Sequence, residues 1–163
     1  MVLIEVVVMK DGGSFESMSK GELVAELKKL YEPVIEDVAV ERAIFAVPHI
    51  RGLIENFNQE NFIVLYLDEK RKVVDKRVVF IGTLNRSLVH PRETFFPAIV
   101  NEKVKSIIVA HNHPSGNDQP SLEDIEMTRK LIKAGEILGV ELFDHVIVTP
   151  TNYYSFKNNR RCF

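Results

Sequence analysis

Cysteine is almost absent from this 163-residue chain, in which Cys162 is the only one. A single cysteine cannot form an internal disulfide, and it excludes a zinc site built from several thiolates. Any metal site in the chain would have to rely on imidazole and carboxylate ligands instead.

Excess basic charge is also missing. The 21 lysines and arginines against 23 acidic residues give a formal charge of -2 and a sequence pI of about 6.2. A dedicated DNA-binding domain usually has a pI above roughly 9, so DNA binding is not supported by charge, although a local basic patch stays open.

Long apolar runs are lacking as well, because none approaches the roughly 18 residues of a membrane span. The apolar N-terminus, MVLIEVVVMKDGG, has neither a basic leading region nor a cleavage site of the signal-peptide kind. We therefore expect a cytoplasmic protein without a membrane partner.

The residues that are present predict a folded α/β chain. Hydrophobic residues make up 45% and charged residues 27%, which suits one domain with a packed core, or one domain plus a small appendage. Apolar runs and turn signals predict strands at 62–67, 73–81, 106–110, 142–148 and 153–156, and helices at 91–100 and 121–138. This order predicts a mixed sheet with helices packed on it, an α/β (α+β) fold.

The N-terminal part is harder to interpret. A strand is expected at 3–9, and Ser19 with Glu22 has the spacing of a capping box that begins a helix. For 38–57 we expect a helix broken near Pro48, followed by a second short helix. We place a boundary between an N-terminal extension, residues 1–58, and a domain at 59–163.

The stretch VAHNHPSGNDQPSLED, residues 109–124, carries the chemistry. Residues i and i+2 of a strand point to the same face, so His111 and His113 can aim two imidazoles at one point. Imidazole nitrogens and carboxylates bind Zn²⁺ at about 2.0–2.2 Å, and a catalytic site keeps one position open for water. Asp124, in the first turn of the next helix, is the candidate third ligand.

The same residues also suit a structural role. Ser121 and Asp124 have nearly the spacing of a capping box, and an acid in the first turn complements the helix dipole. Two histidines in H-x-H spacing before a loop and an aspartate favour the metal. The two interpretations are compatible, since Ser121 can cap the helix while Asp124 turns to the metal.

Other families of H-x-H metal sites do not fit. Amidohydrolase barrels need roughly 250 residues. The metallo-β-lactamase pattern requires Asp and His where Ser115 and Gly116 stand. Zinc deaminases need a P-C-x-x-C motif, and zincins need H-E-x-x-H; this sequence has neither.

What remains, H-x-H followed after seven residues by S-x-x-D, resembles the JAMM motif of the MPN/JAB metalloprotease fold. The wider sequence resembles the RadC branch of that superfamily, over about residues 60–156. The residues that carry this likeness are 82–85, 89–93, 110–116, 120–124 and 144–148.

The resemblance implies a cytidine-deaminase-like fold, a mixed sheet flanked by helices. It implies that Zn²⁺ is held by His111, His113 and Asp124, and that Ser121 helps to stabilise an oxyanion. The glutamate that activates the water would be Glu60.

Glu93 is the alternative to Glu60 as general base. It is the less favoured of the two, because its position also suits the first turn of a helix.

The implied function is a zinc-dependent hydrolase of the JAMM type, a metalloprotease or isopeptidase that cleaves an amide bond in a peptide or protein. The alternative is a RadC-type DNA-repair or mobile-element accessory protein that binds DNA or a protein partner without proteolysis. The first 55 or so residues show no glycine-centred helix-hairpin-helix motif of the kind many RadC proteins use for DNA.

His90, Asn112 and the pair formed by Asp144 and His145 have two interpretations each. His90 is a turn residue before Pro91 or lines the site. Asp144 and His145 form a structural pair, or His145 supports a metal ligand from behind. Asn112 shapes the loop or contacts substrate.

Overall fold

The computed structural model describes residues 6–9, 15–19, 21–22, 25, 38–82 and 89–163. It divides into two compact units, Met1–Asp37 and Val38–Phe163. In the first unit, β1 (Val6–Met9) pairs antiparallel with β2 (Phe15–Met18), so the expected first strand is present over its described part.

The predicted capping box at Ser19 and Glu22, which follows β2, is also present. The Ser19 backbone N–H donates to Glu22 Oε2 at 2.8 Å, and the Glu22 N–H donates to Ser19 Oγ at 3.3 Å. Most of the helix expected after it lies outside the described residues.

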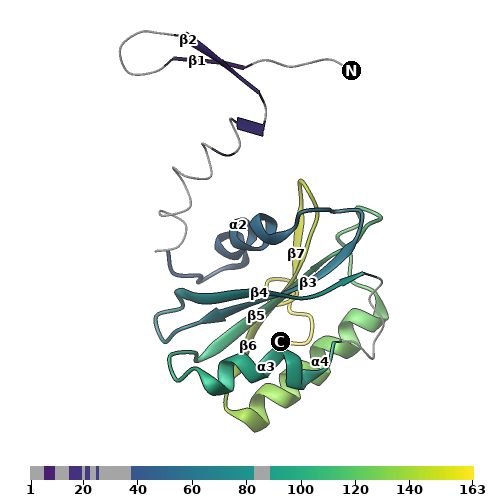
Figure 1. The fold of residues 1–163 in the computed structure, drawn as a ribbon. Helices are drawn as coiled ribbons and strands as arrows, with labels where there is room; N and C mark the ends of the chain where they lie inside the picture. The colour runs from purple at the N-terminus through teal and green to yellow at the C-terminus, as the bar shows by residue number, and fades with distance from the viewer. Residues whose placement is uncertain (1–5, 10–14, 20, 23–24, 26–37, 83–88) are drawn as a thin grey trace. The chain divides into compact units, whose positions relative to one another are not determined.

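The second unit contains one five-stranded mixed sheet with the strand order β4-β3-β5-β6-β7 (Figure 1). Its strands are β3 (Glu60–Leu67), β4 (Val73–Gly82), β5 (Ser106–Asn112), β6 (Glu141–Val148) and β7 (Tyr153–Ser155). Neighbouring strands are antiparallel except β5 and β6, which the helix α4 (Leu122–Leu138) connects as a parallel pair. The predicted fold class, a mixed sheet flanked by helices, is confirmed.

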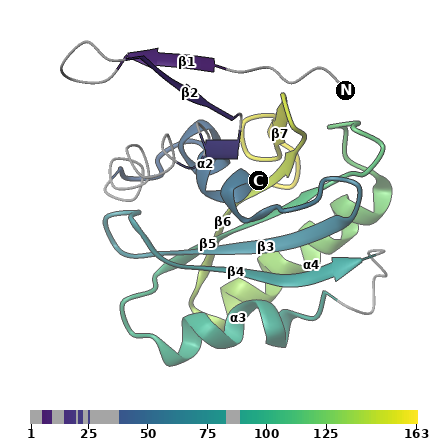
Figure 2. The ribbon, with the colours of Figure 1, turned by 45° about the horizontal axis from the view of Figure 1, so that its top comes forward.

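Helices cover both faces of this sheet (Figures 1 and 2). The helix α2 (Ala43–Leu53) packs on one face, and α3 (Pro91–Val100) and α4 pack on the other. The odd-numbered residues 63, 65 and 67 of β3 face α2, and the even-numbered residues 62, 64 and 66 face α3 and α4. This alternation explains why β3 reads as an unbroken apolar run, since both of its faces are buried.

The same alternation places the histidine-bearing strand. On β5, Ile108 and Ala110 face α2, whereas Ile107 and Val109 face the α3–α4 side. Residue 111 therefore continues the row that faces α4.

The expected break near Pro48 is wrong. One continuous helix, α2, runs from Ala43 to Leu53 with Pro48 inside it. Pro48 removes one backbone donor, but Ala46, Val47 and Ile50 are buried on the sheet, and this packing holds the helix together across the proline.

The domain boundary expected after residue 58 stays a prediction. In the structure, α2 contributes to the same apolar cluster as β3, β5 and β6, and the compact unit begins at Val38.

Among the described residues, no helix combines the length and apolar character that a membrane crossing requires.

Candidate metal centre

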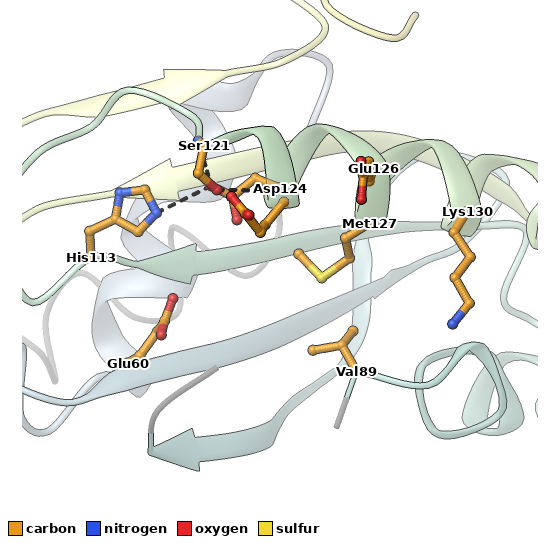
Figure 3. A pocket seen from close by; sticks show the side chains of 9 residues that line it. Glu60, Val89, His113, Ser121, Asp124, Glu126, Met127 and Lys130 are labelled. Carbon is orange, nitrogen blue, oxygen red and sulfur yellow. Dashed lines mark hydrogen bonds and ion pairs between the residues drawn. The ribbon is translucent and has the colours of Figure 1, made fainter. Parts of the chain in front are cut away.

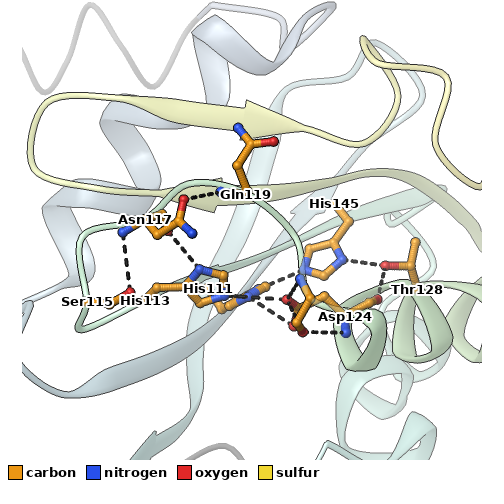
Figure 4. Close-up of polar contacts among 9 residues, drawn as sticks. His111, His113, Ser115, Asn117, Gln119, Asp124, Thr128 and His145 are labelled. Carbon is orange, nitrogen blue, oxygen red and sulfur yellow. Dashed lines mark hydrogen bonds and ion pairs between the residues drawn. The ribbon is translucent and has the colours of Figure 1, made fainter.

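The end of β5 brings two imidazole rings together. His111 is fully buried and pairs in register with Phe62 of β3, and His113 follows where the strand gives way to the loop. The Nε2 atoms of His111 and His113 lie 3.0 Å apart (Figure 4). The H-x-H spacing thus has the geometric effect that strand periodicity predicts.

Asp124 reaches both rings from the first turn of α4. Its Oδ1 lies 3.3 Å from His111 Nε2, and its Oδ2 lies 3.4 Å from His113 Nε2. The carboxylate is buried at the point where strand end and helix start meet. The structure therefore brings the three sequence-predicted ligands, His111, His113 and Asp124, to one place.

Asp124 also belongs to a full capping box. The Asp124 N–H donates to Ser121 Oγ at 3.1 Å, and the Ser121 N–H donates to Asp124 Oδ2 at 2.8 Å. The Ser121 hydroxyl donates to the same Oδ2 at 2.6 Å. Asp124 can therefore cap the helix and contact the histidines at the same time, because the cap orients its carboxylate toward the rings.

Glu60 joins this cluster from β3. Glu60, His111 and His113 offer ligand atoms that all lie within 4.8 Å of one another. Figure 3 shows the Glu60 side chain pointing toward His113 and Asp124 across a pocket of about 370 Å³. The described residues lining it are Glu60, Val89, His113, Ser121, Glu123, Asp124, Glu126, Met127 and Lys130.

Glu93 lies elsewhere. It occupies the first turn of α3, where its carboxylate pairs with Arg92 at 2.9 Å and its side chain is 53% exposed. His90 is the N-cap of the same helix and accepts from the Arg92 N–H at 3.1 Å. The structure places Glu60 and not Glu93 beside the histidines.

Electrostatics at the cluster favour a bound cation. The Asp124 carboxylate accepts a hydrogen bond from protonated His113 and raises the pKa of that ring above 6.5, although partial burial opposes the shift. Burial disfavours the charged form of Asp124, but its contacts with His111, His113 and Ser121 outweigh it and hold the pKa of the carboxyl well below its ordinary value. The site therefore combines an anionic oxygen donor with imidazoles.

The proton positions test whether these residues fit a metal ion. His113 Nδ1 lies 2.8 Å from the Asn117 carbonyl oxygen, which can only accept a hydrogen bond, so Nδ1 carries the proton. Neutral His113 then turns a bare Nε2 toward His111 Nε2 and the Asp124 carboxylate. His113 Nε2 and Asp124 Oδ2 are then two acceptors only 3.4 Å apart, which repel one another unless a cation lies between them, so the donor set fits a metal ion.

Asn112, between the two histidines, points to a different set of partners. Its Oδ1 accepts from the Asn61 backbone N–H at 2.9 Å and from Asn61 Nδ2 at 3.0 Å. Its Nδ2 donates to the carbonyls of Phe57 and Gln59 at 3.1 and 2.9 Å. Asn112 thus ties down the segment that carries Glu60, which agrees with its interpretation as a loop-shaping residue.

Two buried polar residues lie behind the cluster. His145 is fully buried and contacts His111, and Thr128 contacts His145. Sequence reasoning left His145 between two interpretations and missed Thr128. The available signal for Thr128 was its spacing, because it lies four residues after Asp124 and hence on the same face of α4.

Asp144, next to His145, has a structural role. Its carboxylate accepts hydrogen bonds from the His145 N–H at 2.7 Å, the Lys157 N–H at 3.0 Å and the Ser155 hydroxyl at 2.6 Å. Burial raises its pKa in spite of these donors. Asp144 therefore anchors the C-terminal strand and turn to β6.

The chain is thus an α/β domain with a candidate metal centre. Two imidazoles at the end of a strand lie opposite a carboxylate at the start of the following helix. A family model described as RadC-like JAB domain matches residues 41–161. The chain belongs to this RadC-like JAB family, as the sequence motif predicts.

The chain is also similar to several curated proteins that carry the name UPF0758. One from Bacillus licheniformis is 46% identical over 112 residues, which is 69% of this chain and 50% of the relative. One from Methanosarcina acetivorans is 39% identical over 137 residues, 84% of this chain and 58% of the relative. UPF0758 protein YsxA of Bacillus subtilis is 50% identical over 99 residues, 61% of this chain and 42% of the relative. The chain thus spans about half the length of the curated relatives it matches.

Proposed function

We propose that the protein is a zinc-dependent hydrolase of the JAMM type, which cleaves an amide or isopeptide bond in a peptide or protein. The observation that carries this proposal is the Asp124 carboxylate within 3.3–3.4 Å of both imidazole Nε2 atoms, with Glu60 beside them in an open pocket.

His111, His113 and Asp124 would hold the metal ion. Two imidazoles and one carboxylate are a common ligand set for catalytic zinc, and they leave a coordination position for other groups. Zinc held there would supply Lewis acidity, which lowers the pKa of a water molecule and polarises the carbonyl under attack.

Glu60 is suited to proton transfer. Its carboxylate lines the pocket beside the histidines, within reach of a nucleophilic water and of a leaving amine in the same space. A carboxylate in this position can take a proton from water and deliver it to the amine, which typically accounts for about 10²–10⁴-fold in rate.

Ser121 and the apolar side of the pocket would act on the substrate. Ser121 lines the same pocket, and its hydroxyl would have to turn from Asp124 Oδ2 to donate to a developing oxyanion, where such a donor lowers the barrier. Val89 and Met127 provide an apolar surface against which a substrate side chain can pack.

The test combines metal content and hydrolysis. Protein purified without chelator is expected to retain about one zinc per chain, and His113→Ala to lose it. Glu60→Gln is expected to keep the zinc yet lose at least about 100-fold in the rate of cleavage of a peptide library. Glu93→Gln, on the exposed start of α3, is the matched control and is expected to retain both properties.

Three results would contradict the proposal. One is a parent protein that binds no zinc, and another is a His113→Ala variant with the parent's metal content. The third is unchanged function in Glu60→Gln, and together with DNA binding that weakens steeply with salt it would favour an accessory role without proteolysis.

A further inference from the structure

His145 lies directly behind His111, on the neighbouring parallel strand. Its Nε2 is 2.9 Å from His111 Nδ1, the ring nitrogen that faces away from His113 (Figure 4). The ring of Phe156 stacks on His145 with centroids 4.5 Å apart and an interplanar angle of 6°. This stacking holds the plane of the His145 ring, so its two nitrogens have fixed directions.

Thr128 closes the other side of His145. Its Oγ1 lies 2.6 Å from His145 Nδ1 and 2.6 Å from the backbone carbonyl oxygen of Asp124. A carbonyl oxygen only accepts, so the single hydroxyl proton of Thr128 points to it. Thr128 Oγ1 must then accept the hydrogen bond from His145, which places a proton on His145 Nδ1.

The proton on His145 Nδ1 determines which nitrogen of His111 is protonated. His145 is completely buried, and its two nitrogens contact the Thr128 hydroxyl and the His111 ring, neither of which is an anion, so the ring is neutral and carries one proton. With that proton on Nδ1, His145 Nε2 is an acceptor and His111 Nδ1 must donate to it. Neutral His111 is left with a bare Nε2, which faces His113 and Asp124.

The opposite direction would block the centre. If His145 donated from Nε2, His111 would accept at Nδ1 and carry its own proton on Nε2. That proton would lie between His111 and His113, whose Nε2 atoms are 3.0 Å apart, and it would occupy the place of a metal ion. The hydroxyl of Thr128 distinguishes the two directions. If His145 donated from Nε2, Thr128 would have to donate to His145 Nδ1, and its contact with the Asp124 carbonyl oxygen would contain no proton.

We propose that Thr128 and His145 are positioning residues that hold His111 in the tautomer with Nε2 free to bind a metal ion. The inference rests on the proposed function insofar as a metal ion is the ligand of that nitrogen. The chain of hydrogen bonds that runs from the Asp124 carbonyl through Thr128 and His145 to His111 is called the relay here. It begins and ends at Asp124, because the Asp124 carbonyl orients Thr128 and the Asp124 carboxylate contacts His111.

Thr128→Val is the decisive variant, because valine keeps the shape of threonine and removes the hydroxyl. We expect zinc affinity, measured by competition with a chelating dye, to fall about 10- to 100-fold, as for other partners of metal-bound histidines. Thr128→Ser keeps the hydroxyl and is expected to remain within about threefold of the parent protein.

The second readout is the tautomer itself, observed by nitrogen-15 NMR of the imidazoles in metal-free protein, at a pH high enough to keep His113 neutral. The parent and Thr128→Ser are expected to show His111 protonated at Nδ1 alone. Thr128→Val is expected to show a second population protonated at Nε2. A structural role for Thr128 would not change this signal.

Each outcome decides between the alternatives. Protonation of His111 at Nε2 in the metal-free parent overturns the relay, whatever the variants do. So does a Thr128→Val protein with the parent's tautomer, whether its zinc affinity is unchanged or reduced, since a reduction alone reflects packing. A parent that binds no zinc but has His111 protonated at Nδ1 contradicts the proposed hydrolase and leaves the relay supported.

Discussion

The imidazole of His113 makes the centre sensitive to pH. Its Nδ1 is committed to the Asn117 carbonyl, so a second proton can enter only at Nε2, the atom that a metal ion needs. The neighbouring Asp124 carboxylate stabilises the protonated ring and raises its pKa above 6.5. Protons and metal ions therefore compete for one nitrogen atom.

We expect zinc affinity to fall as the pH is lowered through the raised pKa of His113. If one proton is displaced, the affinity falls by about tenfold for each pH unit below that pKa. Titrations with zinc between about pH 8 and about pH 6 test this, with His90→Asn as a control outside the cluster. An affinity that stays constant over this range would show that His113 is not a ligand.

Two histidines affect the stability of the metal-free protein with opposite signs. The raised pKa of His113 stabilises the folded state below the unfolded pKa of about 6.5, and this contribution is lost as the pH rises through the folded pKa. The lowered pKa of His145 acts the other way, because below about pH 6.5 only the unfolded chain takes up its proton. His145 therefore destabilises the folded state in acid, and this penalty disappears as the pH rises above about 6.5.

Among individual residues, sequence reasoning succeeded where chemistry follows from local spacing. The i, i+2 spacing of His111 and His113 fixes a common face, and Ser121 with Asp124 fixes a cap, without reference to the rest of the chain. The role of Thr128 was not predicted, because nothing in the sequence around a threonine inside a helix indicates which residue of another strand it contacts.

At the scale of elements, α4 shows how local signals define a helix. Ser121 caps its start, and Gly139, with φ of 70°, ends it in the left-handed region that favours glycine. Both ends agree with the sequence prediction. The helix thereby holds Asp124 in its first turn, at the end that meets β5.

The middle of α4 contains a glycine that packing requires. A Cβ at Gly135 would lie 2.4 Å from the Val140 carbonyl oxygen and 3.3 Å from Phe95 Cζ. We expect Gly135→Ala to lower the free energy of unfolding by about 1–3 kcal/mol, because the backbone of the following turn must move. Urea denaturation gives this value directly.

Gly52 is the matched control in another helix, α2. A Cβ there meets nothing within 4 Å. Gly52→Ala is expected to leave stability unchanged or raise it by up to about 1 kcal/mol, because alanine restricts the unfolded chain. Equal losses in both variants would mean that the close approach at Gly135 is not what makes glycine necessary there.

For the whole molecule, the candidate ligands come from two elements that are close only in the folded state. His111 and His113 end β5, and Asp124 begins α4. A metal ion bound there binds the folded chain and not the unfolded one, so it must stabilise the fold by mass action.

We expect zinc at about 100 times its dissociation constant to add roughly 2.7 kcal/mol to the stability. For a domain of this size each kcal/mol raises the midpoint of thermal unfolding by about 2–4 °C. Scanning calorimetry with zinc and with chelator measures the shift, which should vanish in His113→Ala and persist in Glu93→Gln. Identical midpoints with zinc and with chelator would argue against a metal centre.

Local sequence patterns predict the order and type of the elements around the sheet, and the motif that joins a strand end to a helix start. These depend on side-chain periodicity and caps, which act over a few residues. The unbroken α2 helix departs from that pattern, because burial of Ala46, Val47 and Ile50 against the sheet outweighs the local effect of Pro48.

Which glutamate lies beside the histidines, and which residues lie behind them, depends on how distant segments of the chain pack together. Glu60 is close because β3 pairs with β5 in a register that sets Phe62 opposite His111. Glu93 does not line the pocket, because its side chain is exposed in the first turn of α3 and pairs with Arg92. The contact between His145 and His111 likewise follows from the parallel pairing of β5 with β6. Strand register joins segments far apart in the chain, and no local pattern encodes it.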